Sequence, residues 1–256
     1  MAFTLVGWSE SQDTSGVLTY VAALADQHVR VEGDSIIVPR TMNYLGAAYA
    51  LGATISNARI ESPSLRRVVN IDLINVDVSA EPASPANFVS WFGNPIELDE
   101  DEGLRALVSE GATGAERETV LAWLTDGRLE PVAGPIYTVR ATSSTTLSAY
   151  AWTNCALTFA QTLPSGRYQV VGLRVISAGA IAARVVFVGG VWRPGCIAYD
   201  AVGDIDVPEF RYGRLGVWGE FEATQPPTVD VLSASADTSE TVYLDLVYLG
   251  AGGAPA

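Results

Sequence analysis

Alternation of apolar and polar residues is the main pattern in this chain. Between Thr241 and Leu249, the side chains of Val242, Leu244 and Leu246 fall on one face and Asp245 on the other. A period of two residues is typical of a β-strand that buries one face. Similar runs recur along the whole chain, and they predict an all-β protein.

The second half holds the clearest series of such runs. Turn residues such as Pro164-Ser165-Gly166 and Gly189-Gly190 separate them. The predicted strands span 136–143, 155–161, 168–176, 182–188, 196–199, 211–222, 228–233 and 241–249. About eight short strands in one stretch of roughly 115 residues, without a helix, indicate a jelly roll or a related sandwich.

The first half is less regular. Its predicted strands span 3–8, 17–23, 35–38, 55–61, 67–78, 88–92 and 119–125. Within 67–78 the apolar positions change phase between Leu73 and Ile74, which indicates a β-bulge.

Two helices are predicted between the strands of the first half. One covers Met42–Leu51, with Thr41 as its N-cap and Gly52 after its end. The other covers Glu100–Glu110, where an acidic first turn suits the helix dipole. Its side chains at Leu104, Leu107 and Val108 would face the core.

These elements predict two antiparallel eight-stranded sandwiches side by side. The first covers residues 1–135 and carries helical insertions near 42–51 and 100–110. The second covers residues 136–250, with the boundary near 131–135, and residues 251–256 form a flexible tail of small residues.

Composition narrows the functional classes. Of 256 residues, 48% are hydrophobic and only 17% are charged, where about 25% is usual. Such a chain can bury a large core and still leave apolar surface for partner chains. The formal net charge is -14, and all 15 basic residues are arginines. Direct binding of nucleic acid is therefore not expected, because it needs a concentrated basic face.

The ends of the sequence carry no recognisable targeting signal. Met1–Leu5 lacks the basic and apolar regions of a secretory leader. The longest apolar helical candidate, Met42–Leu51, is about half as long as a bilayer-spanning helix. We therefore do not expect an integral membrane protein.

Cysteine and histidine offer little catalytic chemistry. Cys155 and Cys196 have no CxxC partner, and together with His28, the single histidine, they cannot supply the four ligands of a zinc site. Two small buried thiols are the favoured interpretation, with a disulfide as the alternative. The sequence contains no GxSxG serine elbow that His28 could activate as a general base, so we do not expect His28 to be catalytic.

Acidic side chains give two further candidates. The run Glu97–Gly103 lacks the ligand spacing of a calcium loop, and a solvated helix start explains it better. Glu220 and Glu222 share one face of a strand, and their spacing alone excludes neither class of glycosidase. We interpret them as a solvent-facing acidic strand.

Tryptophans and arginines give the remaining candidates. The six tryptophans are enough for a sugar-stacking platform, but they are spread over strand-like runs, which favours core or interface packing. Arg66-Arg67 is too short for a nucleic-acid patch, and no glycine-rich nucleotide motif is present. The sequence thus predicts no catalytic, cofactor or metal site, and no enzyme.

The layout resembles the double jelly-roll major capsid proteins of tailless icosahedral viruses. The segments that look similar to the second roll of that family are Leu163–Gly172, Arg193–Gly195 and Phe210–Gly219. The resemblance implies a homotrimer that forms pseudo-hexameric capsomers in the shell of a virus such as a bacteriophage. Its partners would be further capsomers, and penton or minor capsid proteins. The chain would be made in the host cytoplasm and reside in the virion.

Two alternatives stay open at this point. One is a glycan-binding sandwich or viral adhesin, whose tryptophans would be exposed. The other is a jelly-roll enzyme, which the single histidine disfavours because cupin-type metal sites use several.

The resemblance also raises the question of what faces the genome. Residues 1–12 contain neither lysine nor arginine. If the chain forms a shell, we expect an internal membrane, touched only peripherally, or a separate basic protein to lie between it and the genome.

Overall fold

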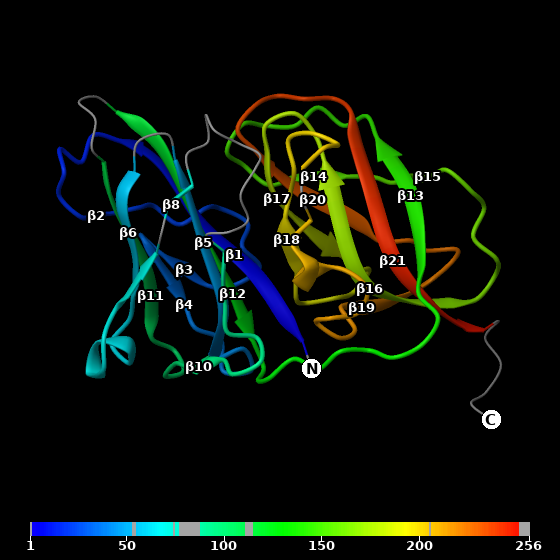
Figure 1. Ribbon diagram of the computed structural model, residues 1–256, viewed down its shortest axis with the longest axis horizontal. Helices are drawn as coiled ribbons and strands as arrows, with labels where there is room; N and C mark the ends of the chain where they lie inside the picture. Colours follow the sequence, from blue (N-terminus) through cyan, green and yellow to red (C-terminus); the bar gives the residue numbers. More distant parts are fainter. Residues whose placement is uncertain are drawn as a thin grey trace. The chain divides into compact units, whose positions relative to one another are not determined.

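In the computed structural model the chain divides into two compact units. The first spans Phe3–Arg128, and the second begins at Leu129. The structure describes residues 2–52, 55–73, 75–76, 88–110, 115–204 and 206–250. Nearly every regular element among these residues is a β-strand (Figure 1), which confirms the all-β prediction.

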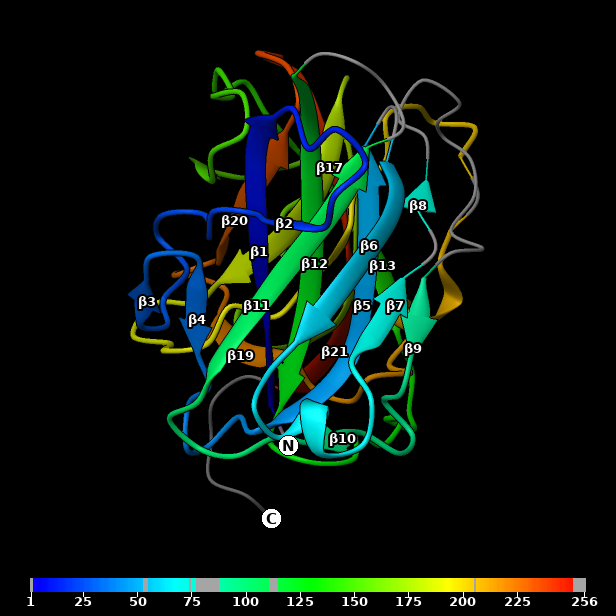
Figure 2. The same ribbon diagram turned by 90° about the vertical axis from the view of Figure 1, so that its left-hand side faces the viewer.

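The first unit is built from two sheets. One sheet has the order β1-β12-β5-β10, with β8 and β9 also paired to β5. The other has the order β3-β4-β11-β6-β7, with β2 also paired to β11. The strands are β1 (Phe3–Gln12), β2 (Thr19–Tyr20), β3 (Val31–Glu32), β4 (Ser35–Ile37), β5 (Tyr44–Gly52), β6 (Ile55–Glu61), β7 (Ile71–Leu73), β8 (Asn75–Val76), β9 (Val89–Ser90), β10 (Ile96–Glu97), β11 (Gly103–Glu110) and β12 (Glu116–Thr125). Figure 2 shows β11 and β6 crossing in front of β12 and β5 as the second layer of this sandwich.

The second unit repeats this plan. One sheet has the order β15-β13-β21-β16-β19 and the other β14-β20-β17-β18. The strands are β13 (Tyr137–Ser143), β14 (Thr153–Cys155), β15 (Thr158–Phe159), β16 (Arg167–Ile176), β17 (Ala180–Val186), β18 (Gly195–Ile197), β19 (Gly219–Glu222), β20 (Thr228–Ser233) and β21 (Glu240–Gly250).

Both units have the strand order of a jelly roll. If the short edge strand β15 is set aside, the second unit has eight strands, and their order is first-eighth-third-sixth in one sheet and second-seventh-fourth-fifth in the other. The first unit has the same order when β2–β4 count as its second strand and the antiparallel β9 and β10 as its sixth, with β8 as an additional short parallel pairing to β5. Two eight-stranded jelly-roll sandwiches therefore follow one another in this chain.

The two predicted helices are wrong. Residues Met42–Leu51 lie mostly in β5, a central strand between β12 and β10, and Glu100–Glu110 lies mostly in β11. A continuous apolar run such as β5 can form either a buried strand or a buried helix, and periodicity alone does not decide between them. The only helical elements among the described residues are the short 3-10 turns η1 (Leu65–Arg67) and η4 (Pro208–Phe210).

Two other expectations need correction. The phase change at Leu73–Ile74 marks a transfer between sheets, because β7 pairs with β6 whereas β8 pairs with β5. Ile74 itself lies outside the described residues. The strand predicted over 211–222 forms only at β19, since residues 211–218 take up turns that include the positive φ angles of Tyr212 and Gly213.

Aromatic side chains pack on one face of the β1-β12-β5 sheet. The ring of Phe92 lies 6.2 Å from that of Phe3, and Phe88 meets Trp123 edge-on at 5.3 Å. Gly46 lies beneath Phe92, where a Cβ atom would come within 2.7 Å of Phe92 Cδ1 and 2.6 Å of Thr125 Cγ2. Such distances are too short for carbon atoms, so this position requires glycine.

We predict that Gly46→Ala destabilises the first unit by about 1–3 kcal/mol through overpacking. Gly93→Ala is a matched control, because no atom lies within 4 Å of a Cβ at that position. Urea unfolding followed by tryptophan fluorescence measures both variants. Equal stability of the two variants would contradict the packing argument.

Candidate functional site

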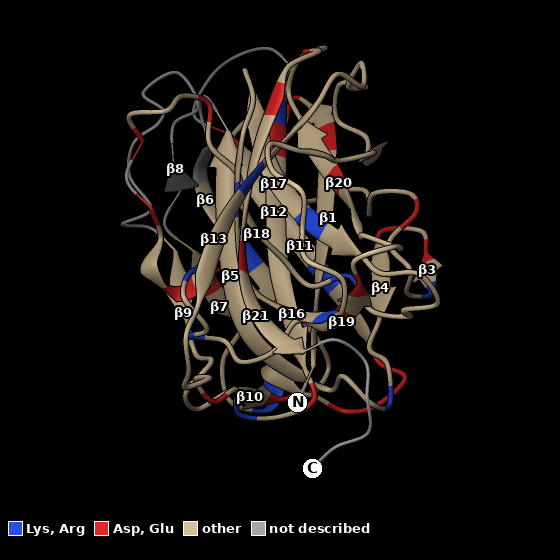
Figure 3. Ribbon diagram, turned by 90° about the vertical axis from the view of Figure 1, so that its right-hand side faces the viewer, with Lys and Arg blue, Asp and Glu red and all other residues tan. Residues whose placement is uncertain are grey.

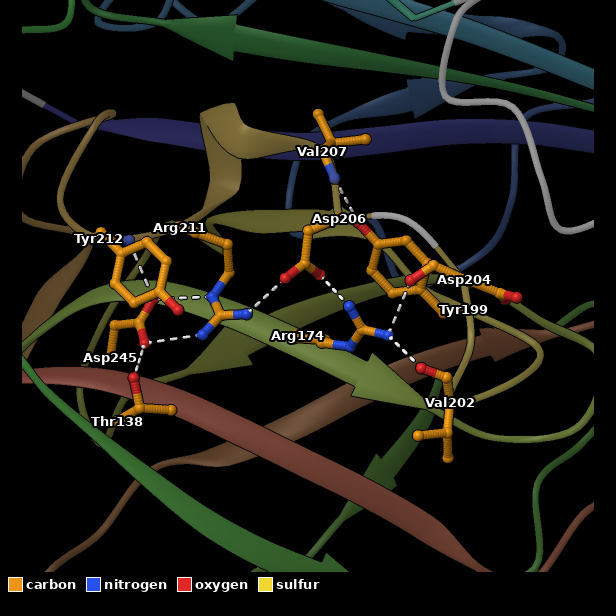
Figure 4. A network of polar contacts seen from close by, with 10 residues as sticks. All are labelled: Thr138, Arg174, Tyr199, Val202, Asp204, Asp206, Val207, Arg211, Tyr212 and Asp245. Atoms are coloured by element: carbon orange, nitrogen blue, oxygen red, sulfur yellow. Dashed lines mark hydrogen bonds and ion pairs between the residues drawn. The ribbon is translucent and has the colours of Figure 1, made fainter.

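A charged network in the second unit is the most elaborate polar arrangement among the described residues (Figure 4). It starts on one face of the β13-β21-β16 sheet, where Thr138, Asp245 and Gly172 are paired across three strands. The opposite face of the same strands carries Val139, Leu244 and Leu173 and is apolar. Polar and apolar residues thus alternate here as the sequence predicts.

The polar face is nevertheless buried. Asp245 is fully inaccessible, and Arg211 is 6% exposed. Arg211 binds both carboxylate oxygens of Asp245, through Nε at 2.8 Å and Nη2 at 3.0 Å. This paired geometry is the strongest arrangement available to an arginine and a carboxylate.

Two further donors complete the shell of Asp245. The hydroxyl of Thr138 donates to Oδ1 at 2.6 Å, and the backbone N–H of Tyr212 donates to Oδ2 at 2.9 Å. Burial would raise the pKa of Asp245, but the hydrogen bonds from Arg211, Thr138 and Tyr212 outweigh it and hold the pKa below its usual value. Asp245 is therefore a permanently charged anchor at neutral pH.

Asp206 extends the network toward Arg174. Arg211 Nη1 lies 2.9 Å from one oxygen of Asp206, and Arg174 binds the other. Arg174 Nη2 also donates to the carbonyl oxygens of Val202 and Asp204, each at 3.1 Å. One arginine on β16 thus holds three points of the segment that follows β18.

Backbone contacts fix the same segment. The N–H of Val207 donates to the hydroxyl of Tyr199 at 2.7 Å, and Gly213 N–H donates to the carbonyl of Val171 at 2.8 Å. A Cβ at Gly172 would lie 3.0 Å from the carbonyl oxygen of Phe210. The segment therefore lies directly on the sheet, and we call residues 199–204 and 206–213, with their partners on β13, β16 and β21, the clamp.

The clamp has the chemistry of a structural element. Arg174, Asp206, Arg211 and Asp245 are joined to one another in a continuous chain of ion pairs. Its effect is to fix the long β18–β19 connection against the sheet.

A tyrosine-lined pocket of about 320 Å³ lies in the second unit. Its lining includes Tyr137, Tyr168, Tyr248, Leu163 and Pro164. The hydroxyls of Tyr168 and Tyr248 donate to the carbonyls of Pro164 and Ser165, so they fix the wall of the pocket. The site suits a small apolar or ring-shaped group.

The cysteines and the histidine are further candidates from the sequence. Cys155 and Cys196 are buried free thiols, and burial raises the pKa of Cys155 to about 11. Such thiols are poor nucleophiles at neutral pH. His28 is exposed in a loop with a φ of 57°.

The acidic run Glu97–Gly103 is a strand, a turn and the start of β11, so its interpretation as a helix start is wrong. Its carboxylates have separate partners. Asp99 binds Arg67, Asp101 binds Arg40, and buried Glu102 accepts hydrogen bonds from Ser64. No group of acidic, histidine or cysteine side chains in the described part of the chain is arranged to hold a metal ion.

Glu220 and Glu222 are exposed on β19, as predicted. Arg167 from β16 pairs with both, and its Nε lies 3.7 Å from Glu222. Both carboxylates are thus bound by one arginine on the exposed surface of the strand, as expected for a solvent-facing acidic strand.

None of the six tryptophans is highly exposed. Trp8, Trp123 and Trp218 are buried, and the remaining three are half-buried. Arg184 covers the ring of Trp152 at 4.1 Å. The tryptophans therefore do not form the exposed platform that the glycan-binding alternative requires.

The basic residues are dispersed among acidic ones (Figure 3). At least ten of the fifteen arginines form an ion pair with a carboxylate, including Arg66 with Glu61 and Arg67 with Asp99. In the described residues, no helix has the length and apolar character needed to cross a bilayer.

Comparison with known proteins gives a single distant likeness. No protein-family model matches the chain, and no curated protein matches it. Among solved structures, the major capsid protein P2 from Bacteriophage PM2 aligns over 98% of this chain and 99% of that one, with 14% identity and a TM-score of 0.28. A likeness at that score supports no inference about function, which has to come from the chain itself.

We predict that Asp245→Asn lowers the stability of the second unit by about 3–5 kcal/mol at pH 7, because it removes the carboxylate that pairs with two nitrogens of buried Arg211 and leaves only Asp206, which Arg211 shares with Arg174. The folded pKa of Asp245 lies below its unfolded value, so the wild-type contribution is present above about pH 4 and is lost as the pH falls further. Urea unfolding as a function of pH measures both effects.

Glu222→Gln is the control for that experiment. It breaks an exposed ion pair with Arg167, which is worth at most about 1 kcal/mol. If Asp245→Asn costs no more than this control, the clamp does not stabilise the unit.

Proposed function

We propose that this chain is the structural subunit of a virus shell: a major capsid protein of the double jelly-roll class. The observation that carries the proposal is the repeat of one jelly-roll strand order in two successive units of the same chain. Fold alone does not define function, so the surface of the units has to be consistent with the role.

The surface supports an assembling subunit. Val68, Val188 and Val202 are 89%, 75% and 78% exposed, so loops of both units present apolar side chains that other chains could cover. The chain contains no lysine, and most of its arginines are bound by carboxylates of the same chain. Apolar loops with few mobile charges are suited to extensive protein–protein contact.

Assembly would follow from the repeat. Two sandwiches in each chain give six in a homotrimer, and six similar sandwiches arranged around the threefold axis would approximate a hexagon that can tile an icosahedral shell. Such capsomers would contact one another and the penton or minor proteins of a virion. The protein would be made in the cytoplasm of the host, and we expect no catalytic activity.

We predict that the purified chain forms a trimer of about 81 kDa, three times its 27.1 kDa mass, at micromolar concentration. Light scattering coupled to gel filtration gives the mass, and negative-stain microscopy shows the shape. A stable monomer at all concentrations up to the solubility limit would exclude the proposal.

A shell of this composition would not bind its genome directly. The net charge is -14, and residues 1–12 carry no basic side chain. A membrane or a basic protein would then lie between shell and genome. We predict no gel shift of DNA or RNA at about 0.15 M salt, whereas the same chain with an added N-terminal arginine stretch should shift both. Salt-sensitive binding by the unmodified chain would contradict this part of the proposal.

The tyrosine-lined pocket favours a second candidate, a glycan-binding sandwich or adhesin. Tyr137 and Tyr248 are 57% and 40% exposed at this pocket, and aromatic faces can stack on sugar rings. Binding on a glycan array that disappears in Tyr137→Ala and Tyr248→Ala, from a protein that stays monomeric, would support this candidate over the shell subunit.

A further inference from the structure

The tyrosine-lined pocket of the second unit is built on the apolar face of one sheet. Tyr137 on β13 lies opposite Leu246 on β21, and Tyr168 on β16 lies opposite Tyr248 on β21. Residues so paired point to the same face of a sheet, and so do Leu246 and Tyr248, which are two positions apart on one strand. Leu246 and Tyr168 are buried, whereas Tyr137 and Tyr248 are exposed. The pocket therefore has a buried floor and an open rim of two tyrosines.

One wall of the pocket is held in place by hydrogen bonds. Leu163 and Pro164 form this wall. The hydroxyl of Tyr168 donates to the carbonyl oxygen of Pro164 at 2.8 Å, and the hydroxyl of Tyr248 donates to that of Ser165 at 2.9 Å. A site whose walls are already fixed loses little conformational entropy when a ligand binds. The pocket is therefore prepared for a ligand rather than a gap that a partner would have to reshape.

The described residues that line the pocket carry no charge. All nine are apolar, aromatic or neutral polar. Phosphate and carboxylate groups are normally bound by arginine or lysine, and neither residue type lines this pocket. The net charge of -14 also repels anions from the chain as a whole. The pocket is therefore suited to a neutral ligand.

Neutral hydrogen-bonding groups complete the lining. They are the hydroxyl of Tyr137, the amide of Gln161 and the hydroxyl of Thr162. Within the described part of the chain, no hydrogen bond occupies any of these three side chains. A hydrocarbon or a quaternary ammonium group would leave all three unused, whereas the hydroxyl groups of a ligand can both donate to them and accept from them. Aromatic faces beside such groups fit a ring that has an apolar face and a hydroxylated edge.

We propose that this pocket binds one neutral sugar ring, such as a hexose or an N-acetylhexosamine. Its volume of about 320 Å³ is at the lower end of the range of about 300–1,000 Å³ for small-molecule sites, so it takes a single ring rather than a longer chain. The C–H face of the ring stacks on the exposed tyrosines, and its hydroxyl groups bind Gln161 and Thr162. The inference rests on the glycan-binding candidate above and names its ligand, and it holds for a monomer as well as for a shell subunit.

Saturation-transfer NMR on the full chain tests the proposal. The neutral probes are methyl hexosides and methyl N-acetylhexosaminides, and the charged probes are glucuronic acid and sialic acid. The usual binding energy per non-hydrogen atom gives a single ring a Kd of about 1 mM. At least one neutral probe should receive saturation, most strongly at the protons of its C–H face, and the acidic probes should receive none. Absence of a signal from every neutral probe at about ten times that concentration would overturn the proposal.

Variants of the lining locate the binding. Tyr137→Ala removes a stacking face and should raise the Kd of the best neutral probe at least about fivefold. Tyr137→Phe keeps that face and should cost less. Gln161→Ala removes one hydrogen bond and should cost about fivefold. The matched control is Gln225→Ala, at an exposed glutamine of a different hollow in the same unit, and it should bind as the wild type does. Melting curves show that each variant is folded.

The remaining outcomes separate this inference from the proposed shell function. Binding that is unchanged in Tyr137→Ala and Gln161→Ala, or equally strong for acidic sugars, would overturn the inference. Binding of p-cresol without that of any sugar would also overturn it, because the pocket would then take an aromatic group. Light scattering of the same sample gives the assembly state. A trimer that binds no sugar removes the inference and leaves the shell function, whereas a monomer that binds neutral sugars does the reverse.

Discussion

Each unit depends on the pairing of its first strand with its last. In the first unit β1 pairs with β12 along ten residues, from Phe3 opposite Thr125 to Gln12 opposite Glu116. In the second unit β13 pairs with β21 in the same way. These contacts join positions about 100 residues apart, so their entropic cost has to be met before the intervening strands can add to the sheets. The pairing fixes the order of every other strand.

The same pairing places buried acids in both units. Glu118 lies opposite Glu10 in the first unit, and Asp245 lies opposite Thr138 in the second. Neither pair is close in sequence. In the second unit a long connection then brings the decisive partner, Arg211 from the β18–β19 segment.

Much of the fold could be predicted from the sequence because strand alternation is strong. The strands at Ile55–Glu61 and Thr228–Ser233 have the predicted bounds residue for residue. The failures occur where alternation is absent or misleading. The strand β5 is buried on both faces, so its apolar run resembled a helix, and β11 has an acidic turn before it that resembled a helix start. Pairing with neighbouring strands outweighs such local preferences.

The polar sites were less predictable. Alternation correctly places Asp245 on the polar face of β21, but only the tertiary structure shows that residues 206–213 cover that face. Glu118 lies before the predicted start of its strand at Thr119. The sequence nevertheless indicates that Glu118 is buried. It continues the alternation of Val120, Ala122 and Leu124, all of which are fully buried. An acidic residue at a position whose side chain points into the core indicates a carboxyl group that needs either a hydrogen-bonding partner or a proton.

The pKa values of the buried acids in this chain are shifted in two opposite directions. In the second unit Arg211 keeps Asp245 ionised, so this contribution to stability weakens in acid. Glu240, 1% exposed on the apolar face of β21, has no such cation; burial raises its pKa, and the nearby hydroxyl of Ser143 offsets this only in part. Glu118 occupies a similar place near the start of β12 in the first unit.

The last strand of each jelly roll therefore carries, near its start, a carboxyl group whose pKa is raised by burial. Ionisation of these groups opposes folding as the pH rises, whereas protonation of Asp245 opposes it as the pH falls. The combined effect places the pH of greatest stability between the folded pKa of Asp245 and that of Glu118. Two requirements of the fold set the position of that maximum. The covered polar face of β21 needs the ion pair between Asp245 and Arg211, which is lost in acid. A buried carboxyl group such as that of Glu118 is stabilised by a proton, which is lost in base.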